Sequence, residues 1–170
     1  GKGAGQAEGS AGMKLLVFSD SHGKSREVSR MLRRAEKGGK PDMALFAGDG
    51  LYDALDLRYE GYIVQAVRGN CDLAVPPDVP DEMTFPAGKR LIYLTHGHRL
   101  RVKYGLTALC CRAHEVGADL AIYGHTHHQA LEERDGILLL NPGALRQGEF
   151  AVVEIGDAGA IKCRLIGGNQ

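Results

Sequence analysis

The chain has 170 residues, and its 21 Lys or Arg balance its 21 Asp or Glu, so the formal net charge is zero. Because a chain of this length buries roughly two thirds of its unfolded surface on folding, it needs no disulfide framework. A neutral chain has no general attraction to nucleic acid or to anionic membranes, so we expect its partners to bind at a local site.

Residues 1–12, GKGAGQAEGSAG, contain no apolar segment, and Met13 is followed at once by an apolar run. We therefore expect residues 1–12 to be a cloning remnant or a disordered leader, and residues 13–170 to form one domain. The longest aliphatic or aromatic runs, at residues 15–18 and 137–140, are far too short to cross a bilayer. The sequence thus predicts a cytoplasmic protein without a membrane segment.

The first half of the chain alternates strands with helices. Apolar runs predict strands at residues 14–19, 43–47 and 62–67. Apolar residues at helical spacing predict a helix at about residues 25–37, and a short helix is expected between the second and third strands. This alternation is typical of crossover units with parallel strands.

The second half begins with a predicted hairpin and one more crossover unit, and it ends in antiparallel hairpins. Asp135-Gly136, between two apolar runs, is a strong hairpin signal. The predicted strands lie at residues 82–85, 90–95, 120–123, 129–134, 137–141, 150–155 and 161–166, with a helix at residues 102–116. The pattern indicates an α/β fold with two facing mixed sheets and helices on their outer faces.

Polar residues follow five of the predicted strands where each strand ends. The clusters are Ser19-Asp20-Ser21-His22, Gly48-Asp49, Gly69-Asn70-Cys71-Asp72, His96-Gly97-His98 and Gly124-His125-Thr126-His127-His128. Loops at the carboxyl ends of parallel strands share one edge, so the clusters can converge. Turn chemistry accounts for Asp, Asn, Ser and Gly in loops, but not for six of the seven histidines.

Carboxylate, amide and imidazole groups in these loops are typical ligands of borderline divalent metals. A glycine directly precedes Asp49, Asn70 and His125, where the backbone can approach a bound group closely. Seven such donors are too many for one structural zinc ion, which takes four ligands. They would suit two ions about 3.5–4 Å apart that share a carboxylate.

In their order along the chain, these motifs resemble those of the calcineurin-like metallophosphoesterase superfamily. The motifs that carry the resemblance are Asp20-x-His22, Gly48-Asp49, Gly69-Asn70, His96 and Gly124-His125-x-His127. The short length and the GNCD sequence are most similar to the small prokaryotic phosphodiesterase branch, which shares its fold with a retromer scaffold subunit. The resemblance implies a four-layer α/β/β/α sandwich from Met13 onward.

The resemblance also implies two divalent transition-metal ions, with Mn²⁺ preferred over Fe, Zn, Ni or Co. Asp20, His22, Asp49 and His127 would hold one ion. The second ion would be held by Asp49, which bridges the two, and by Asn70, His96 and His125.

The leading hypothesis is a phosphodiesterase that acts on a small or nucleotide-like diester, with a metal-bridging hydroxide as nucleophile. One alternative is a protein-interaction scaffold on the same fold with a vestigial metal site, and another is a phosphomonoesterase. Retention of the Asp20-x-His22 block and of both histidines in the Gly124 block favours an enzyme. The sequence leaves nucleic-acid binding open, and exposed strand edges are compatible with a homodimer.

Asn70, Cys71 and His98 are the candidate catalytic residues. In the superfamily a histidine commonly follows the Gly-Asn pair and is thought to protonate the leaving group, whereas this chain has Cys71. A thiol, with a reference pKa of about 8.5 against about 6.5 for imidazole, is the poorer proton donor. Cys71 would then assist the leaving group only weakly or be purely structural. His98 is either a substitute acid or a residue that supports the metal ligands from behind.

Other residues are assigned to packing or to the surface. Residues 24–40 carry seven Lys or Arg against Glu27 and Glu36, which is typical of a solvated face, although attraction of a polyanion is an alternative. His114 is interpreted as a surface or core residue without a role. The four cysteines lack CxxC spacing, and Cys110, Cys111 and Cys163 are expected to be small buried hydrophobes.

Overall fold

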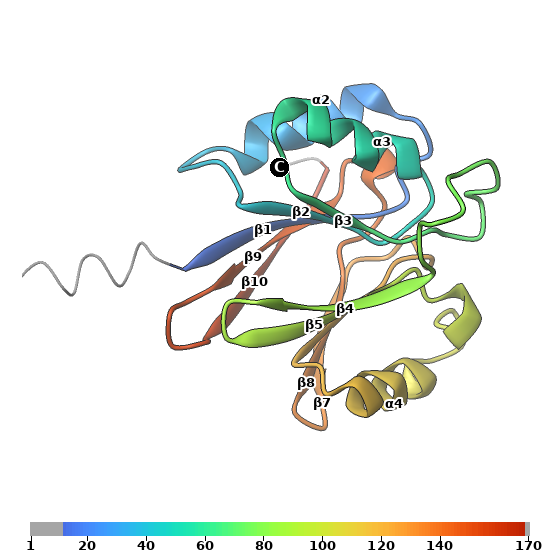
Figure 1. Cartoon of the computed structure of the whole chain (residues 1–170), viewed down its shortest axis with the longest axis vertical. Helices are drawn as coiled ribbons and strands as arrows, with labels where there is room; N and C mark the ends of the chain where they lie inside the picture. The colour runs from blue at the N-terminus through green and yellow to red at the C-terminus, as the bar shows by residue number, and fades with distance from the viewer. Residues whose placement is uncertain (1–11, 169–170) are drawn as a thin grey trace, which may run out of the picture.

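A computed structural model of the chain describes residues 12–168, so the expected leader lies outside the described residues except for Gly12. Within this part of the chain, no helix combines the length and apolar character that crossing a membrane requires. Two sheets stand face to face, and helices flank the pair (Figure 1).

The first sheet combines parallel and antiparallel strands. β1, β2 and β3 are parallel, and Leu16 of β1 pairs with Ala44 of β2. β9 runs antiparallel to β1, and β10 pairs with β9 at the edge. Its described strands, in spatial order, are β10 (Ile161–Ile166), β9 (Phe150–Ile155), β1 (Met13–Phe18), β2 (Met43–Phe46) and β3 (Val64–Ala66).

The second sheet is also mixed. β5, β6 and β8 are parallel, whereas β4 and β7 pair antiparallel at the two edges. The expectation of an antiparallel C-terminal part therefore holds for the two hairpins, while β8 also extends the parallel sheet. Its described strands, in spatial order, are β4 (Glu82–Ala87), β5 (Arg90–Thr95), β6 (Leu120–Ile122), β8 (Ile137–Asn141) and β7 (Ala130–Arg134).

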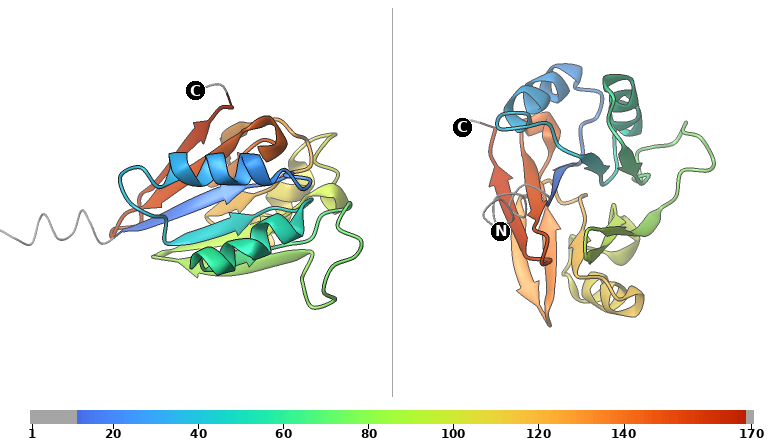
Figure 2. Two further views of the ribbon diagram at one scale, coloured as in Figure 1. Left: turned by 90° about the horizontal axis from the view of Figure 1, so that it is seen from above. Right: turned by 60° about the vertical axis from the view of Figure 1, so that its left-hand side comes forward.

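Helices cover the outer face of each sheet, which confirms the four-layer sandwich. α2 (Ser25–Ala35) and α3 (Leu51–Leu55) lie over the first sheet when it is seen from above (Figure 2). α4 (Thr107–Val116) lies on the far side of the second sheet (Figure 1). The short 3₁₀ helices are η1 (Asp56–Glu60), η2 (His98–Leu100) and η3 (Leu145–Gln147).

The layers follow from strands with two apolar faces. Because side chains alternate along a strand, Val17 of β1 points to the core between the sheets and Phe18 to the core beneath α2. A strand buried on both faces has a nearly continuous apolar run, as β1 does. On the other side, Ala121 of β6 packs with Leu109 of α4. The two sheets thereby hold their carboxyl-end loops in fixed relative positions.

The helix predicted at residues 102–116 begins only at Thr107. Arg101 adopts a left-handed conformation with φ of 56°, and Gly105 has φ of 150°. Neither conformation continues an α-helix, so residues 101–104 form turns instead. The early start was wrong because the apolar spacing of this segment says nothing about these backbone angles.

Candidate metal centre

The loops after five parallel strands meet at one edge of the sandwich. The Asp20 N–H donates to the Gly48 carbonyl at 2.9 Å, and the Gly124 N–H donates to the His96 carbonyl at 3.0 Å. Between the sheets, the His125 N–H donates to Asp20 Oδ2 at 3.1 Å. The predicted convergence is therefore present, and backbone hydrogen bonds hold it.

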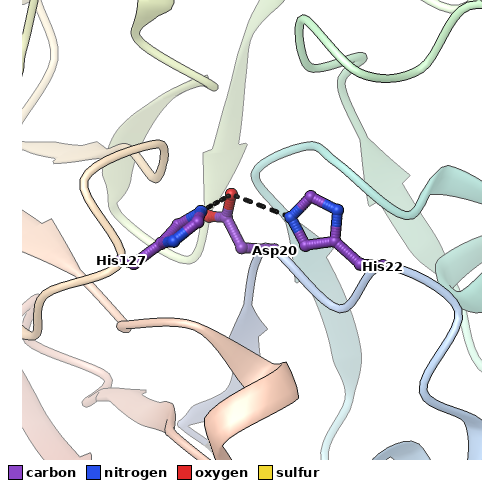
Figure 3. Close-up of side chains that lie close together, drawn as sticks. All are labelled: Asp20, His22 and His127. Carbon is purple, nitrogen blue, oxygen red and sulfur yellow. Dashed lines mark ion pairs between the residues drawn. The ribbon is translucent and has the colours of Figure 1, made fainter.

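Asp20, His22 and His127 form a first donor group, whose possible ligand atoms lie within 4.8 Å of one another. The Asp20 carboxylate lies between the two imidazoles (Figure 3). Its Oδ1 atom is 3.1 Å from His127 Nε2 and 3.9 Å from His22 Nε2. Asp20 is fully buried, and Ser19 Oγ donates to its Oδ2 at 2.5 Å.

Asp20 Oδ1 is buried and accepts no well-directed hydrogen bond from residues 12–168. A buried carboxylate oxygen that no well-directed hydrogen bond satisfies is costly unless a cation neutralises it. Once His22 Nε2 and His127 Nε2 carry no proton, both imidazoles provide further lone pairs at the same point. The first donor group therefore fits a divalent metal ion.

Asp49, His96 and His125 form a second donor group, again within 4.8 Å. Asp49 Oδ2 lies 3.2 Å from His96 Nε2, which in turn lies 3.2 Å from His125 Nδ1. His96 Nδ1 is 2.6 Å from the Ala47 carbonyl, which can only accept, so Nδ1 carries the proton. In the neutral ring, Nε2 then offers its lone pair to the group, as in metal-binding histidines oriented by a carbonyl.

Electrostatics couple Asp49 to His96. Burial raises the pKa of the Asp49 carboxyl, but the hydrogen bond and charge of His96 and the hydrogen bonds from Cys71 outweigh burial and hold the pKa well below its usual range. Burial lowers the pKa of His96, but Asp49, Asp20 and the Ala47 carbonyl together raise it above the ordinary value. A metal ion at this point would take the place of the proton shared by the pair.

The histidines of the β6 loop are biased toward their neutral form. Burial and the charges of His96 and Lys103 lower the pKa of His125 to about 4. Burial also lowers the pKa of His127, although Asp20 opposes the shift. Neutral imidazoles are the form that binds metal ions, so both side chains are available as ligands at neutral pH.

The backbone at these positions is strained. Among residues 12–168, seven non-glycine residues have positive φ, and five of them belong to the two donor groups: Asp20, His22, Asp49, His125 and His127. Such conformations cost about 1–3 kcal/mol each and persist where the surroundings impose them, often at functional sites. These conformations direct the side chains of each donor group toward a common point.

All three predicted close-approach glycines are required sterically, and a Cβ at Gly48 would lie 2.6 Å from His96 Nδ1. A Cβ at Gly69 would lie 2.1 Å from Asp49 Oδ1, and a Cβ at Gly124 would lie 2.1 Å from Ser19 Oγ. Real Cβ atoms do not approach other atoms so closely. The backbones of these loops therefore pack directly against the donor side chains.

Asp72 organises the loops of the first sheet, a role that the sequence analysis missed. Its carboxylate accepts the backbone N–H groups of Asp49 at 2.8 Å, Gly50 at 2.9 Å, Leu51 at 3.1 Å and Gly69 at 2.8 Å. The bond from Gly69 spans three residues, which is turn chemistry that Asp often supplies. The GNCD sequence could have predicted this local bond, but it could not have predicted the three hydrogen bonds to the Asp49 loop.

Asn141 organises the loop of β6 in the second sheet and is fully buried. Its Nδ2 atom donates to the Gly124 carbonyl at 3.2 Å and to Thr126 Oγ1 at 2.9 Å. Its Oδ1 atom accepts the Gly143 N–H at 2.9 Å. Ala144, in the loop that follows Asn141, is buried and carries no polar side-chain group.

The structure places Asn70, Cys71 and His98 near the donor groups in different ways. The Cys71 N–H donates to Asp49 Oδ1 at 2.8 Å, while the exposed Asn70 amide donates to Cys71 Sγ at 3.7 Å. The His98 ring centroid is 5.4 Å from that of His96. His98 Nδ1 is buried and has no hydrogen-bond partner among the described residues. The ligand role of Asn70 and the catalytic roles of all three stay predictions.

Arg146 also reaches the first donor group, and nothing in the sequence pointed to it. Its exposed guanidinium lies 3.1 Å from His127 Nδ1, and its backbone N–H donates to the Asp20 carbonyl at 3.2 Å. His128, the residue after His127, is exposed. Arg146 therefore places a fixed positive charge at the rim of the site.

The calcineurin-like phosphoesterase superfamily domain model matches residues 13–158. The chain belongs to this superfamily. Its relatives include the probable metallophosphoesterase YsnB of Bacillus subtilis, 38% identical over 134 residues that cover 79% of this chain and 76% of that protein. The phosphodiesterase YfcE of Escherichia coli is 32% identical over 155 residues, which cover 78% of this chain and 79% of that protein.

Solved structures agree with the fold. A predicted phosphoesterase from Streptococcus pneumoniae superposes with a TM-score of 0.76 at 29% identity, covering 94% of this chain and 92% of that one. Vacuolar protein sorting 29 from Cryptosporidium parvum has a TM-score of 0.73 at 19% identity, covering 92% and 98%, and shows the fold alone. The superfamily uses divalent metals, and the two donor groups are the candidate ligands here.

Proposed function

We propose that this protein is a phosphodiesterase whose two donor groups hold a pair of divalent metal ions, Mn²⁺ in the first instance. The observation that carries the proposal is the buried Asp20 Oδ1, which no well-directed hydrogen bond from the described residues satisfies and which lies between two imidazoles. The second donor group lies on neighbouring loops and offers a carboxylate and two imidazoles. Asp49 is proposed to bridge the ions, and Asn70 to complete the second set.

Bound divalent ions would supply a water molecule activated for attack at phosphorus and would neutralise the charge of the phosphate oxygens. The side chains of the site prepare for this chemistry. Asp49 is ionised and His125 is neutral at neutral pH, so neither must release a proton before it binds a metal ion. The Ala47 carbonyl fixes the His96 ring, and Arg146 is placed to pair with a phosphate oxygen at the rim.

The candidate acids are poor proton donors, which favours substrates with good leaving groups. Burial raises the pKa of the Cys71 thiol, and Asp49 and Asp72 raise it further. Burial lowers the pKa of His98, and the charge of His96 acts in the same direction. At neutral pH the thiol holds its proton firmly and the imidazole is deprotonated, so neither assists a departing alkoxide well.

The name of one relative supports diester hydrolysis over the alternatives. YfcE is named a phosphodiesterase, and YsnB a probable metallophosphoesterase. Vacuolar protein sorting 29 has the same fold, so the scaffold hypothesis is an outcome that the experiment must be able to return. The six residues of the two donor groups are all present and clustered, which favours the enzyme.

The test uses metal-free protein reloaded with Mn²⁺ and assayed with bis(p-nitrophenyl) phosphate and p-nitrophenyl phosphate. We expect two Mn²⁺ ions per chain by elemental analysis, and faster hydrolysis of the diester than of the monoester. The exposed Asp157→Asn variant, far from the donor groups in the chain, is the matched control for Asp49→Asn. Bound metal without turnover of either ester would support the scaffold, and faster hydrolysis of the monoester would make the protein a monoesterase.

A further inference from the structure

A third group of metal-type donors lies outside the candidate metal centre. Cys110 Sγ, an imidazole nitrogen of His114 and a carboxylate oxygen of Asp135 lie within 4.8 Å of one another. Cys110 and His114 belong to α4, and Asp135 belongs to the turn between β7 and β8. We call these three residues the Cys110 group.

The Cys110 group lies at the opposite end of the second sheet from the candidate metal centre. β8 begins at Ile137, directly after the turn, and Leu138 of β8 pairs with Leu120, the first residue of β6. The turn therefore lies at the amino end of β6, whereas His125 and His127 follow its carboxyl end. Figure 1 shows the end of α4 next to the β7–β8 hairpin.

Local geometry accounts for the meeting of the three side chains. Residues four positions apart on a helix lie on the same face, so Cys110 and His114 point the same way. Asp135 has φ of 51° and precedes Gly136 with φ of 81°, which is the conformation of a tight hairpin turn. Cys110 Sγ also lies 3.8 Å from the Arg134 carbonyl, so the hairpin rests directly on this face of α4.

We propose that Cys110, His114 and Asp135 bind one Zn²⁺ ion, which connects α4 to the β7–β8 hairpin. Sulfur, imidazole and carboxylate donors suit Zn²⁺, with bond lengths of about 2.0–2.3 Å. A thiolate and a carboxylate balance the two positive charges of the ion. A soft thiolate donor distinguishes this group from the two donor groups, which consist of oxygen and nitrogen donors.

The exposure of the donors is compatible with binding from solvent. Cys110 is buried, while His114 and Asp135 are exposed and free to approach the ion. Three protein ligands leave a fourth tetrahedral position for water or for an outside ligand. The ion would anchor β7, the edge strand of the second sheet, to the helix that covers that sheet.

Co²⁺ is the probe for the proposal, because a thiolate bound to tetrahedral Co²⁺ gives a charge-transfer absorption that oxygen and nitrogen ligands do not. Metal-free full-length protein is titrated with Co²⁺ alone, and then with Zn²⁺ as competitor. We expect a thiolate band whose full height corresponds to one Co²⁺–thiolate site per chain and that Zn²⁺ abolishes. Because the two donor groups of the candidate metal centre also take up Co²⁺, the titration is carried beyond three equivalents. Cys110→Ser should remove the band. Cys111→Ser, an exposed neighbour on the same helix, is the matched control and should keep it.

His114→Gln and Asp135→Asn change exposed side chains, so they test the proposal even if Cys110→Ser fails to fold. Each should weaken Co²⁺ binding at the thiolate band by about tenfold or more, because even outer contacts of metal sites are worth about 10- to 100-fold. Absence of a thiolate band in the unmodified protein would overturn the proposal. So would a band that is lost in Cys71→Ser but kept in Cys110→Ser, since the thiolate would then belong to the candidate metal centre.

Discussion

The loops of the two sheets bring different chemistry to the candidate metal centre. Those of the first sheet provide the carboxylates of Asp20 and Asp49, the predicted ligand Asn70 and one imidazole, His22. The three candidate ligands from the second sheet are His96, His125 and His127. Each donor group in the described structure contains residues from both sheets. A complete site therefore exists only when the sheets are packed together.

The two sets of loops are also held differently. On the first sheet, one charged side chain, Asp72, accepts four backbone N–H groups. On the second sheet, the neutral amide of Asn141 binds the loop that carries His125 and His127. Hydrogen bonds to charged groups are worth about 1.5–3 kcal/mol, against about 1 kcal/mol for neutral ones. The first-sheet loops should therefore respond more strongly to loss of their anchor.

The largest effect is expected when the oxygen donors lose the carboxylate proposed to bridge the ions. Asp49→Asn should reduce Mn²⁺-dependent diester hydrolysis by about 1000-fold, or about 4 kcal/mol, since metal ions contribute several kcal/mol to stabilising the transition state. The bound Mn²⁺ should also fall below two per chain. Steady-state kinetics and elemental analysis check both results. Unchanged turnover would show that Asp49 is not a ligand.

Removal of the first-sheet anchor should have the next largest effect. Asp72→Asn leaves buried N–H groups facing an amide, and each unsatisfied group costs about 1–3 kcal/mol. We expect the free energy of unfolding to fall by about 2–4 kcal/mol and Mn²⁺ affinity to fall by about 10- to 100-fold. Urea unfolding and metal titration measure these changes. Asp78→Asn, exposed in the following loop, should change neither.

The second-sheet anchor should matter less. Asn141→Ala removes neutral hydrogen bonds to Gly124 and Thr126, so we expect a loss of about tenfold in Mn²⁺ affinity. Metal titration beside Asp72→Asn compares the two anchors directly. A larger loss for Asn141→Ala than for Asp72→Asn would contradict the contrast between charged and neutral anchors.

The sequence was sufficient to predict most strands and the side chains at their ends. Alternation of strands and helices indicates which strand ends share an edge, so the clusters at Asp20, Asp49 and His125 could be expected to converge before the structure. Packing of the sheets against each other came from the family resemblance, since periodicity does not specify it. The roles of Asp72 and Arg146 depend on contacts between distant loops, and no local pattern encodes those contacts.

The Cys110 group shows a different limit of the sequence. Cys111 was expected to be buried with Cys110, but the structure exposes it and buries only its neighbour. Helical spacing relates Cys110 to His114, yet only the register of β8 against β6 brings Asp135 to the same helix face. The donors of the candidate metal centre follow strands and are visible as clusters, whereas these three are scattered over 26 positions of the chain.

A histidine at position 71 would add a second imidazole to the first-sheet loops, which otherwise provide mainly oxygen donors. Cys71→His should supply a better general acid, so rates on alkyl diesters should rise about tenfold relative to activated aryl diesters. The unmodified protein should show a strong dependence on leaving-group pKa, and the variant a weaker one. Kinetics on a series of diesters checks this, with Cys71→Ala as the control that should keep the strong dependence. A rate insensitive to leaving-group pKa in the unmodified protein would refute a weak acid at Cys71.

The smallest expected effect separates two imidazoles that lie 3.2 Å apart on the second-sheet loops, His96 and His125. In metal-free protein, an NMR titration should show His125 protonating near pH 4, since burial and the charge of His96 lower its pKa to about 4. His96 should titrate above the ordinary value of about 6.5, because Asp49 outweighs its burial. Two adjacent rings would thus shift in opposite directions.

The two shifts also oppose each other in stability. Between pH 6.5 and about 4, His125 is protonated in the unfolded chain but neutral in the folded chain. This residue therefore destabilises the metal-free fold as pH falls. His96 stabilises the fold below its unfolded pKa, and this contribution is lost as pH rises through its higher folded pKa. His125→Gln should therefore reduce the loss of stability on acidification below pH 6.5. If the variant lost as much stability below pH 6.5 as the unmodified protein, His125 would not be held in its neutral form.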